Sequence, residues 1–188
     1  MSRQVKPFIE NTRLAKIVLI ACIVLSIAVI GPVKLSGVRK DELDVFRNGT
    51  EKGIVVSVYT DLVAAAESAN RLSHIASAYL GENHSDVRKL KESAEKILST
   101  SDADKMLSAF SGLSLPAENV SSALDGKLTE KEEREVRSLF ANIDSYSSTI
   151  KRDKYFTLAN DFNGKRGAFP AVIFAGLFGI DKLPTGGK

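Results

Sequence analysis

One uninterrupted apolar stretch near the N-terminus restricts the folds open to this chain more than any other feature. From Leu14 to Val33 the sequence reads LAKIVLIACIVLSIAVIGPV, with Lys16 as its single charge. A helix over residues 17–33 is about 26 Å long, and with a lysine at each end it covers a hydrocarbon core of about 30 Å. The stretch is apolar on all sides, unlike the single stripe of a surface helix. We therefore predict a transmembrane helix over residues 14–33, with membrane-spanning positions that include Ile17, Leu19, Cys22, Leu25 and Ile30.

Two processing signals offer alternative interpretations of this stretch. LIAC, residues 19–22, matches the lipobox pattern after which bacterial lipoproteins are cleaved and lipidated. A lipobox cysteine normally closes its apolar run, whereas aliphatic residues continue here to Pro32, which favours Cys22 as a small membrane hydrophobe. Cleavage as a secretory signal peptide is the second alternative. Against it, the run exceeds the usual apolar region of about 7–15 residues, and no A-x-A site closes it.

Basic residues flank the predicted span on both sides and leave its orientation nearly balanced. The positive-inside rule counts lysine and arginine within short flanking segments, and each side carries four. The short, charged N-terminus resembles a signal-anchor and favours an N-terminus inside the cell with the body outside. We expect a single-pass protein of the cell membrane whose lipid contact is made by residues 14–33.

The charge of the chain is divided unevenly along its length. The net charge is +3, but residues 1–40 hold seven Lys/Arg and one acid, whereas residues 41–188 hold nineteen Lys/Arg and twenty-two Asp/Glu. A nucleic-acid footprint needs a concentrated basic face, and the body has no basic surplus. We therefore expect no nucleic-acid partner.

The body of the chain has the periodicity of amphipathic helices. Gly37, Gly49 and Gly53 mark a juxtamembrane linker over residues 34–53. Beyond it, apolar residues recur every three or four positions. This spacing predicts helices over about 54–80 and 85–99, a third after Ser101, a short one after Pro116, and a long one that begins at residue 129 and is expected to continue to residue 162.

Helix-terminal residues support these boundaries. Gly81 is expected to end the first helix, and Ser85 and Ser101 to cap the next two. Thr129 and Glu132 have the spacing of a capping box. The predicted fold class is all-α, with an N-terminal transmembrane helix followed by an elongated antiparallel bundle of three to four helices. The expected segments are a tail (1–13), the span (14–33), the linker (34–53), the bundle (54–166) and an apolar C-terminal segment with its tail (167–188).

The C-terminal segment GAFPAVIFAGLFGI, residues 167–180, is unusually apolar. Its run from Phe169 to Ile180 is twelve residues long, too short to cross a bilayer as a helix. The segment has two interpretations, of which we favour the first: it caps the core of the bundle, or part of it stays exposed and docks a protein partner or the bilayer interface. The candidate docking residues are Phe169, Pro170, Phe174, Leu177 and Phe178.

A family resemblance lies in the same region. Tyr155, Phe162-Asn163, Phe169-Pro170 and the later A-G-L-F-G at residues 175–179 together resemble the C-terminal signature of the LemA family. Phe162 stands where that signature usually has tyrosine, and Phe156 where it has asparagine. The resemblance implies an N-terminally anchored bundle of long helices with no established enzymatic activity.

Motifs for catalysis or cofactor binding do not stand out in the sequence. His74 and His84 lack metal-site spacing, PTGGK near the C-terminus lacks the spacing of a phosphate loop, and no serine lies in a G-x-S-x-G elbow. We predict no catalytic, cofactor or metal site. The expected function is a membrane-anchored, non-catalytic scaffold or adaptor for an unknown protein partner, with homo-oligomers left open. The alternative is an enzyme or small-molecule binder that uses a bundle-core cavity.

Overall fold

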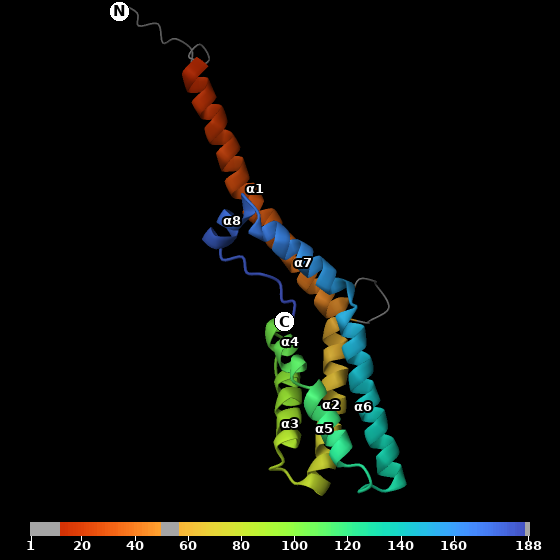
Figure 1. The fold of residues 1–188 in the computed structure, drawn as a ribbon. Coiled ribbons are helices and arrows are strands. Elements are labelled where there is room, and N and C mark those ends of the chain that lie inside the picture. The colour runs from red at the N-terminus through yellow and green to blue at the C-terminus, as the bar shows by residue number, and fades with distance from the viewer. Residues whose placement is uncertain (1–11, 50–56, 187–188) are drawn as a thin grey trace, which may run out of the picture. The chain divides into compact units, whose positions relative to one another are not determined.

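The computed structural model describes residues 12–49 and 57–186 (Figure 1). These two ranges contain no strand, so the predicted all-α class is confirmed. The helices are α1 (Thr12–Asn48), α2 (Val58–Leu80), α3 (Ser85–Leu98), α4 (Ala103–Ser111), α5 (Ser114–Ala123), α6 (Glu130–Lys151), α7 (Lys154–Gly167) and α8 (Ala171–Leu177).

The described residues form two compact units. Unit 1 comprises the described residues up to Lys40 together with Phe162–Lys182, and therefore contains most of α1, the end of α7, and α8. Unit 2 comprises the described residues of Asp41–Asp161 and of the C-terminal tail from Leu183, and contains helices α2 to α6. Helices α1 and α7 each run from one unit into the other. Unit 1 therefore combines the N-terminal part of the chain with a C-terminal segment that lies far from it in sequence.

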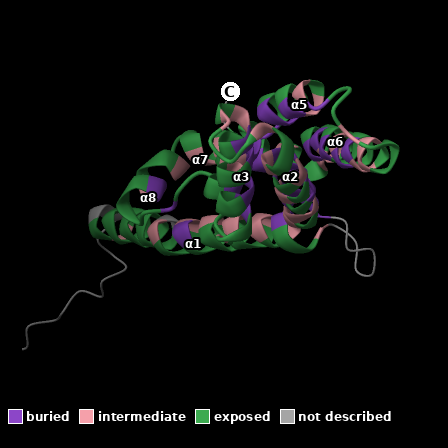
Figure 2. Cartoon of the chain, turned by 90° about the horizontal axis from the view of Figure 1, so that it is seen from below, coloured by how far each residue is buried: buried purple, intermediate pink, exposed green. Residues whose placement is uncertain are grey.

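The core of unit 2 is built where the amphipathic helices meet. Helix α2 packs against α3 and α6, α3 also contacts α4 and α5, and α5 contacts α6. The buried faces of these helices turn toward one another (Figure 2). The predicted arrangement of three to four helices is not confirmed, because the short helices α4 and α5 also pack against α2 and α3. Fully buried side chains of this core include Leu62, Leu72, Leu90, Ile97, Leu113 and Ile143.

Two of the predicted helix ends are confirmed. Gly81 terminates α2 with a positive φ of 85°, a conformation that glycine adopts without steric cost. At the start of α6, Thr129 accepts a bond from the Glu132 amide while the Glu132 carboxylate accepts one from the Thr129 amide. This is the predicted capping box, and it satisfies two amides that the helix itself leaves unpaired.

Two predicted N-caps are wrong by one residue. The N-cap of α3 is His84, so that Ser85 is already helical, and the N-cap of α4 is Asp102 rather than Ser101. The Asp102 carboxylate accepts a hydrogen bond of 3.0 Å from the Lys105 amide. Aspartate and serine are nearly equivalent N-caps, so composition alone could not choose between adjacent residues.

The glycine-broken linker predicted for residues 34–53 is wrong over its described part, because α1 continues as a helix to Asn48. Gly37 lies inside this helix; a glycine there costs about 1 kcal/mol relative to alanine. Apolar residues at helical spacing outweigh that cost, notably Phe46, which is fully buried in unit 2. Gly49, with φ of 77°, follows the last residue of the helix, whereas Gly53 lies outside the described residues.

The long helix predicted from residue 129 to 162 is interrupted. Helix α6 ends at Lys151 and α7 begins at Lys154. The Asp153 carboxylate accepts a hydrogen bond of 2.7 Å from the Tyr155 amide in the first turn of α7, as an N-cap side chain does. The apolar stripe nevertheless continues, since Tyr155 and Phe162 are both buried. The spacing of apolar residues is therefore the same on both sides of the break between α6 and α7, so this spacing could not predict the break.

Candidate functional site

Aliphatic side chains of α1 are exposed along the predicted span. Ile17, Leu19 and Leu25 are 61–65% exposed, Ile30 is also exposed, and so is Cys22. Among the residues that the structure describes, α1 is the one helix long and apolar enough to cross a membrane, by length and composition. The side chains predicted to span are therefore presented outward from the helix, in contact with the surrounding medium.

Helix α8 lies beside α1 within unit 1 (Figure 1). A Cβ atom added to Gly31 would lie 3.4 Å from two ring atoms of Phe174, so this ring contacts the α1 backbone in the last turns of the predicted span. A groove of about 330 Å³ surrounds this contact. It is lined by α1, α7 and α8 through Leu35, Val38, Phe162, Pro170 and Phe174, together with Lys34 and Lys165.

The outer side of α8 and its flanks is apolar and exposed. Phe169, Leu177 and Phe178 are 82%, 74% and 59% exposed, and Pro170 is also exposed. Of the large apolar side chains between residues 169 and 180, only Ile180 is buried. The favoured expectation that this segment caps the core is therefore wrong for most of its large side chains, which lie in unit 1 and face outward.

The chain reverses direction immediately after α8. Gly179 has a φ of 61°, and the Ile180 amide donates a hydrogen bond to the Ala175 carbonyl, which closes the helix C-terminus. Two arginines then hold the returning segment. Arg166 Nε donates to the Ile180 carbonyl at 2.5 Å, and Arg39 Nε donates to the Asp181 carbonyl at 3.1 Å. Helix α8 and its flanking residues, Phe169 to Phe178, thus form the apex of a turn. Its two arms are α7 and the returning segment, and the Arg166 side chain joins them.

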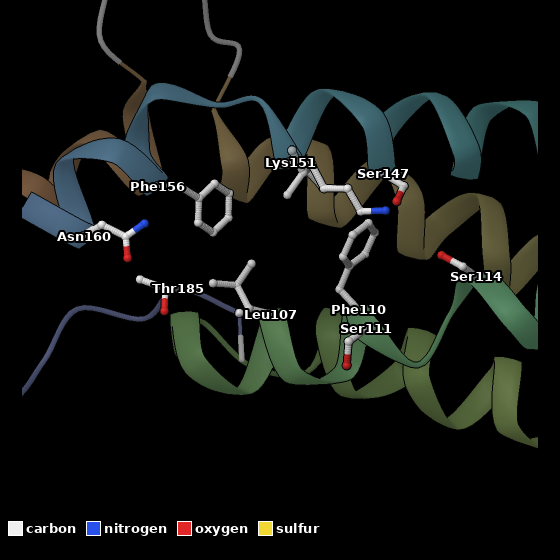
Figure 3. A pocket seen from close by; sticks show the side chains of 11 residues that line it. Leu107, Phe110, Ser111, Ser114, Ser147, Lys151, Phe156, Asn160 and Thr185 are labelled. Atoms are coloured by element: carbon white, nitrogen blue, oxygen red, sulfur yellow. The ribbon is translucent and has the colours of Figure 1, made fainter. Parts of the chain in front are cut away.

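A second candidate site is a pocket of about 450 Å³ in unit 2 (Figure 3). Its apolar lining includes Leu107, Phe110 and Phe156, and among the described residues that line it Lys151 is the one cation. This volume falls within the usual range of small-molecule sites, about 300–1,000 Å³. The polar groups that line it are the side chains of Ser111, Ser114, Ser147, Asn160 and Thr185.

Sequence reasoning missed this pocket, because its residues come from α4, α5, α6, α7 and the C-terminal tail. The tail reaches the pocket through an ordered contact, since the buried Tyr155 hydroxyl donates a hydrogen bond of 2.9 Å to the Pro184 carbonyl. No motif or spacing links Thr185 to residues of α4. The glycine and proline residues of the tail are typical of an unstructured chain end, so they gave no indication that the tail lines a pocket.

Three titratable groups of unit 2, Asp61, Tyr79 and Glu132, have shifted pKa values and line neither site. Burial raises the pKa of the Asp61 carboxyl, and the negative charge of Asp153 raises it further. At the capping box, the hydrogen bonds from Thr129 and Tyr79 lower the pKa of Glu132, and the bond to Glu132 raises the pKa of Tyr79. The last two shifts follow from the helix cap on an exposed surface.

Over the residues that the structure describes, no three histidine, cysteine, aspartate or glutamate side chains come together as a metal site. His74 is exposed in α2, and His84 is the N-cap of α3, so the two histidines lie on different elements. The chain also matches no protein-family model, no curated protein and no solved structure.

Proposed function

We propose that this protein is a single-pass membrane protein in which α1 spans the bilayer through residues 14–33 and holds a helical scaffold beside the membrane. The observation that carries this proposal is the outward exposure of the aliphatic side chains of α1. Full burial of one such side chain is worth about 1.5–3 kcal/mol. Eleven large apolar side chains between Leu14 and Val33 are exposed, each by 38–70%, so transfer of this partly exposed surface out of water is worth on the order of 10–20 kcal/mol.

Unit 2 is the part that we propose to present to a protein partner. Its helices bury their apolar faces against each other and turn charged side chains outward, as on the exposed faces of α3 and α6. The resemblance to the LemA family, which implies an N-terminally anchored helical bundle with no established enzymatic activity, supports a non-catalytic role at the cell membrane. The short, charged N-terminus favours an orientation with the N-terminus inside the cell, and we propose that this unit lies outside the cytoplasm.

Replacement of the span tests the anchoring part of the proposal. A chain in which residues 17–33 are replaced by a polar, flexible linker should leave the membrane fraction and retain the helical circular dichroism of unit 2. A matched control with the same segment replaced by an unrelated run of leucines should stay in membranes and resist alkaline carbonate. If the linker chain stays in the membrane fraction as the leucine chain does, α1 is not the anchor.

A small-molecule binder is the second candidate function, and the pocket of unit 2 favours it. The rings of Phe110 and Phe156 and the Lys151 ammonium line one cavity (Figure 3). This combination suits a small anionic molecule that has an apolar or aromatic part, because the cation pairs with the charge while the rings cover the apolar part. Native mass spectrometry of the full chain purified in detergent tests this function. A co-purifying anion should be lost in Lys151→Gln and kept in Lys89→Gln, a control in α3.

A further inference from the structure

We infer that the apex formed by Phe169 to Phe178 is a second membrane contact, which inserts into the interface of the leaflet where α1 leaves the bilayer. The inference rests on the proposed span, since α1 fixes the position of that interface. It names the bilayer itself as the occupant of the exposed apolar surface of α8. Three independent features of unit 1 support it: depth, exposure and charge.

The depth of α8 is set by its contact with α1. The Phe174 ring lies against Gly31, two residues before Val33, where the predicted span ends. At a rise of about 1.5 Å per residue, this contact lies only about 3 Å inside the end of the span. Phe174 is therefore level with the boundary between acyl chains and headgroups, the depth at which interfacial helices settle.

The exposed side chains on α8 and its flanks suit that boundary. Phe169, Leu177 and Phe178 are more than half exposed, and Val172 and Ile173 are exposed beside them on the first turn of α8. In water, a turn between a helix and its returning segment normally carries polar residues. Here the most apolar part of the C-terminal segment is placed at the apex, so the apex favours a medium that is less polar than water.

The charges around the apex match an anionic headgroup layer. Lys34 lines the same groove as Phe174, and its side chain is exposed. A lysine in this position extends its ammonium group toward phosphates while its methylenes cover apolar surface. A bilayer accounts for both the apolar side chains and the flanking lysine, and it is continuous with the lipid that surrounds α1. A second copy of the chain would have to displace that lipid at the same depth.

Single tryptophans report directly on this insertion, because the chain contains no tryptophan of its own. We would reconstitute the full chain as Phe169→Trp or Phe178→Trp in vesicles of phosphatidylcholine and phosphatidylglycerol. The vesicles would carry bromine either near the headgroup end of the acyl chains or near their terminal methyls. Both substitutions are at exposed aromatic side chains, so the fold is preserved, and circular dichroism of each variant verifies that.

Two control variants distinguish this inference from the proposed span. The tryptophan of Leu25→Trp is within the span, and its fluorescence should be quenched by brominated lipid. The tryptophan of Leu115→Trp replaces an exposed side chain of α5 in unit 2, and its fluorescence should not be quenched. We expect Phe169→Trp and Phe178→Trp to emit at shorter wavelength than Leu115→Trp. Their emission should be quenched more by shallow bromines than by deep ones.

Each other outcome overturns a specific part of the account. If Leu25→Trp is quenched but Phe169→Trp and Phe178→Trp emit like Leu115→Trp, the span stands and the second contact is wrong. If both emit at shorter wavelength without quenching, protein rather than lipid covers the apex, and the second contact is also wrong. If Leu25→Trp itself is unquenched, the proposed span fails and the inference fails with it.

Discussion

Leu72 in α2 and Leu25 in α1 are both leucines within long helices, yet Leu72 is fully buried and Leu25 is 63% exposed. The local sequences explain the difference. Around Leu72 the apolar residues recur every three or four positions, whereas around Leu25 nearly every residue is apolar. A stripe is buried by neighbouring helices, but a helix that is apolar on every side needs an apolar medium. The two units are therefore built for different surroundings.

Charge divides the two units in the same way. The sequence ranges of unit 1 carry ten Lys/Arg and two Asp/Glu, and those of unit 2 carry sixteen and twenty-one. The basic excess near the N-terminus is visible in sequence, but Lys165, Arg166 and Lys182 join it only through the fold. Basic residues around the apolar helix suit anionic headgroups, and the acidic surface of unit 2 disfavours close approach to them.

The largest contrast is expected from truncating the two leucines. Leu72→Ala should lower the free energy of unfolding of unit 2 by about 2–5 kcal/mol, because it leaves a cavity in the packed core. Leu25→Ala should leave that free energy unchanged, since its side chain takes no part in the core. Urea unfolding of the full chain in detergent micelles, followed by circular dichroism, measures both. Equal losses in the two variants would break the comparison.

A charge placed in the span sharpens the comparison. Ile23→Lys should reduce stable membrane insertion, because a lysine at the centre of a spanning helix costs about 2.5–3.5 kcal/mol. Leu115→Lys places the same charge on an exposed residue of α5 and should have no effect. The fraction of chain that resists alkaline carbonate extraction measures insertion. Equal resistance of both variants would contradict a spanning α1.

The attachment of the C-terminal tail to unit 2 can be tested at a single hydroxyl group. Tyr155→Phe removes the buried hydrogen bond to the Pro184 carbonyl and should destabilise unit 2 by about 1–3 kcal/mol, since the carbonyl loses its donor. Tyr79→Phe removes an exposed hydrogen bond to Glu132 and should cost less. Thermal unfolding of the two variants gives the comparison, and an equal or larger effect at Tyr79 would contradict it.

A smaller effect distinguishes a true helix cap from a neighbouring residue. Thr129→Ala should cost about 1 kcal/mol, because the residue is the N-cap of α6 and half of its capping box. Ser85→Ala should cost almost nothing, because α3 has His84 rather than Ser85 at its N-cap. Chemical unfolding of the full chain measures both. A larger loss at Ser85 would contradict His84 as the N-cap of α3.

The smallest expected effect depends on pH. Because burial and Asp153 raise the pKa of Asp61, the folded chain holds this proton to higher pH than the unfolded chain, whose carboxyl titrates near the ordinary value of 3.8. Stability should therefore fall as pH rises from that value through the raised pKa. Asp61→Asn should remove this fall, and so be the more stable chain at pH 7 with no advantage in acid. Asp144→Asn, at an exposed position of α6, should show neither effect.

The sequence was sufficient for features that depend on neighbouring residues. The apolar stretch of α1, the Thr129–Glu132 capping box and the end of α2 at Gly81 each follow from a few adjacent positions. The sequence was insufficient where tertiary contacts outweigh local preference. Phe46 is buried in unit 2 and the helix extends through Gly37, and Asp153 starts a new helix within a continuous stripe.

The candidate sites were predictable only in part. Phe169, Leu177 and Phe178 could be selected as unusual from composition, but neither their exposure nor the contact of Phe174 with Gly31, more than 140 positions earlier, could be. The pocket around Lys151 draws on five segments and has no local pattern. The resemblance to the LemA family and the scaffold role stay predictions.

The most direct test of a spanning α1 uses the chain's single cysteine, Cys22, which is exposed on α1 within the predicted span. An impermeant maleimide would be applied to intact and to lysed cells, with Ser111→Cys in a Cys22→Ala background as the control in unit 2. If α1 spans the bilayer, Cys22 should stay unlabelled from both sides and react only after detergent denaturation, while Ser111→Cys should react from one side. Labelling of Cys22 in intact or lysed membranes without detergent would contradict a transmembrane α1.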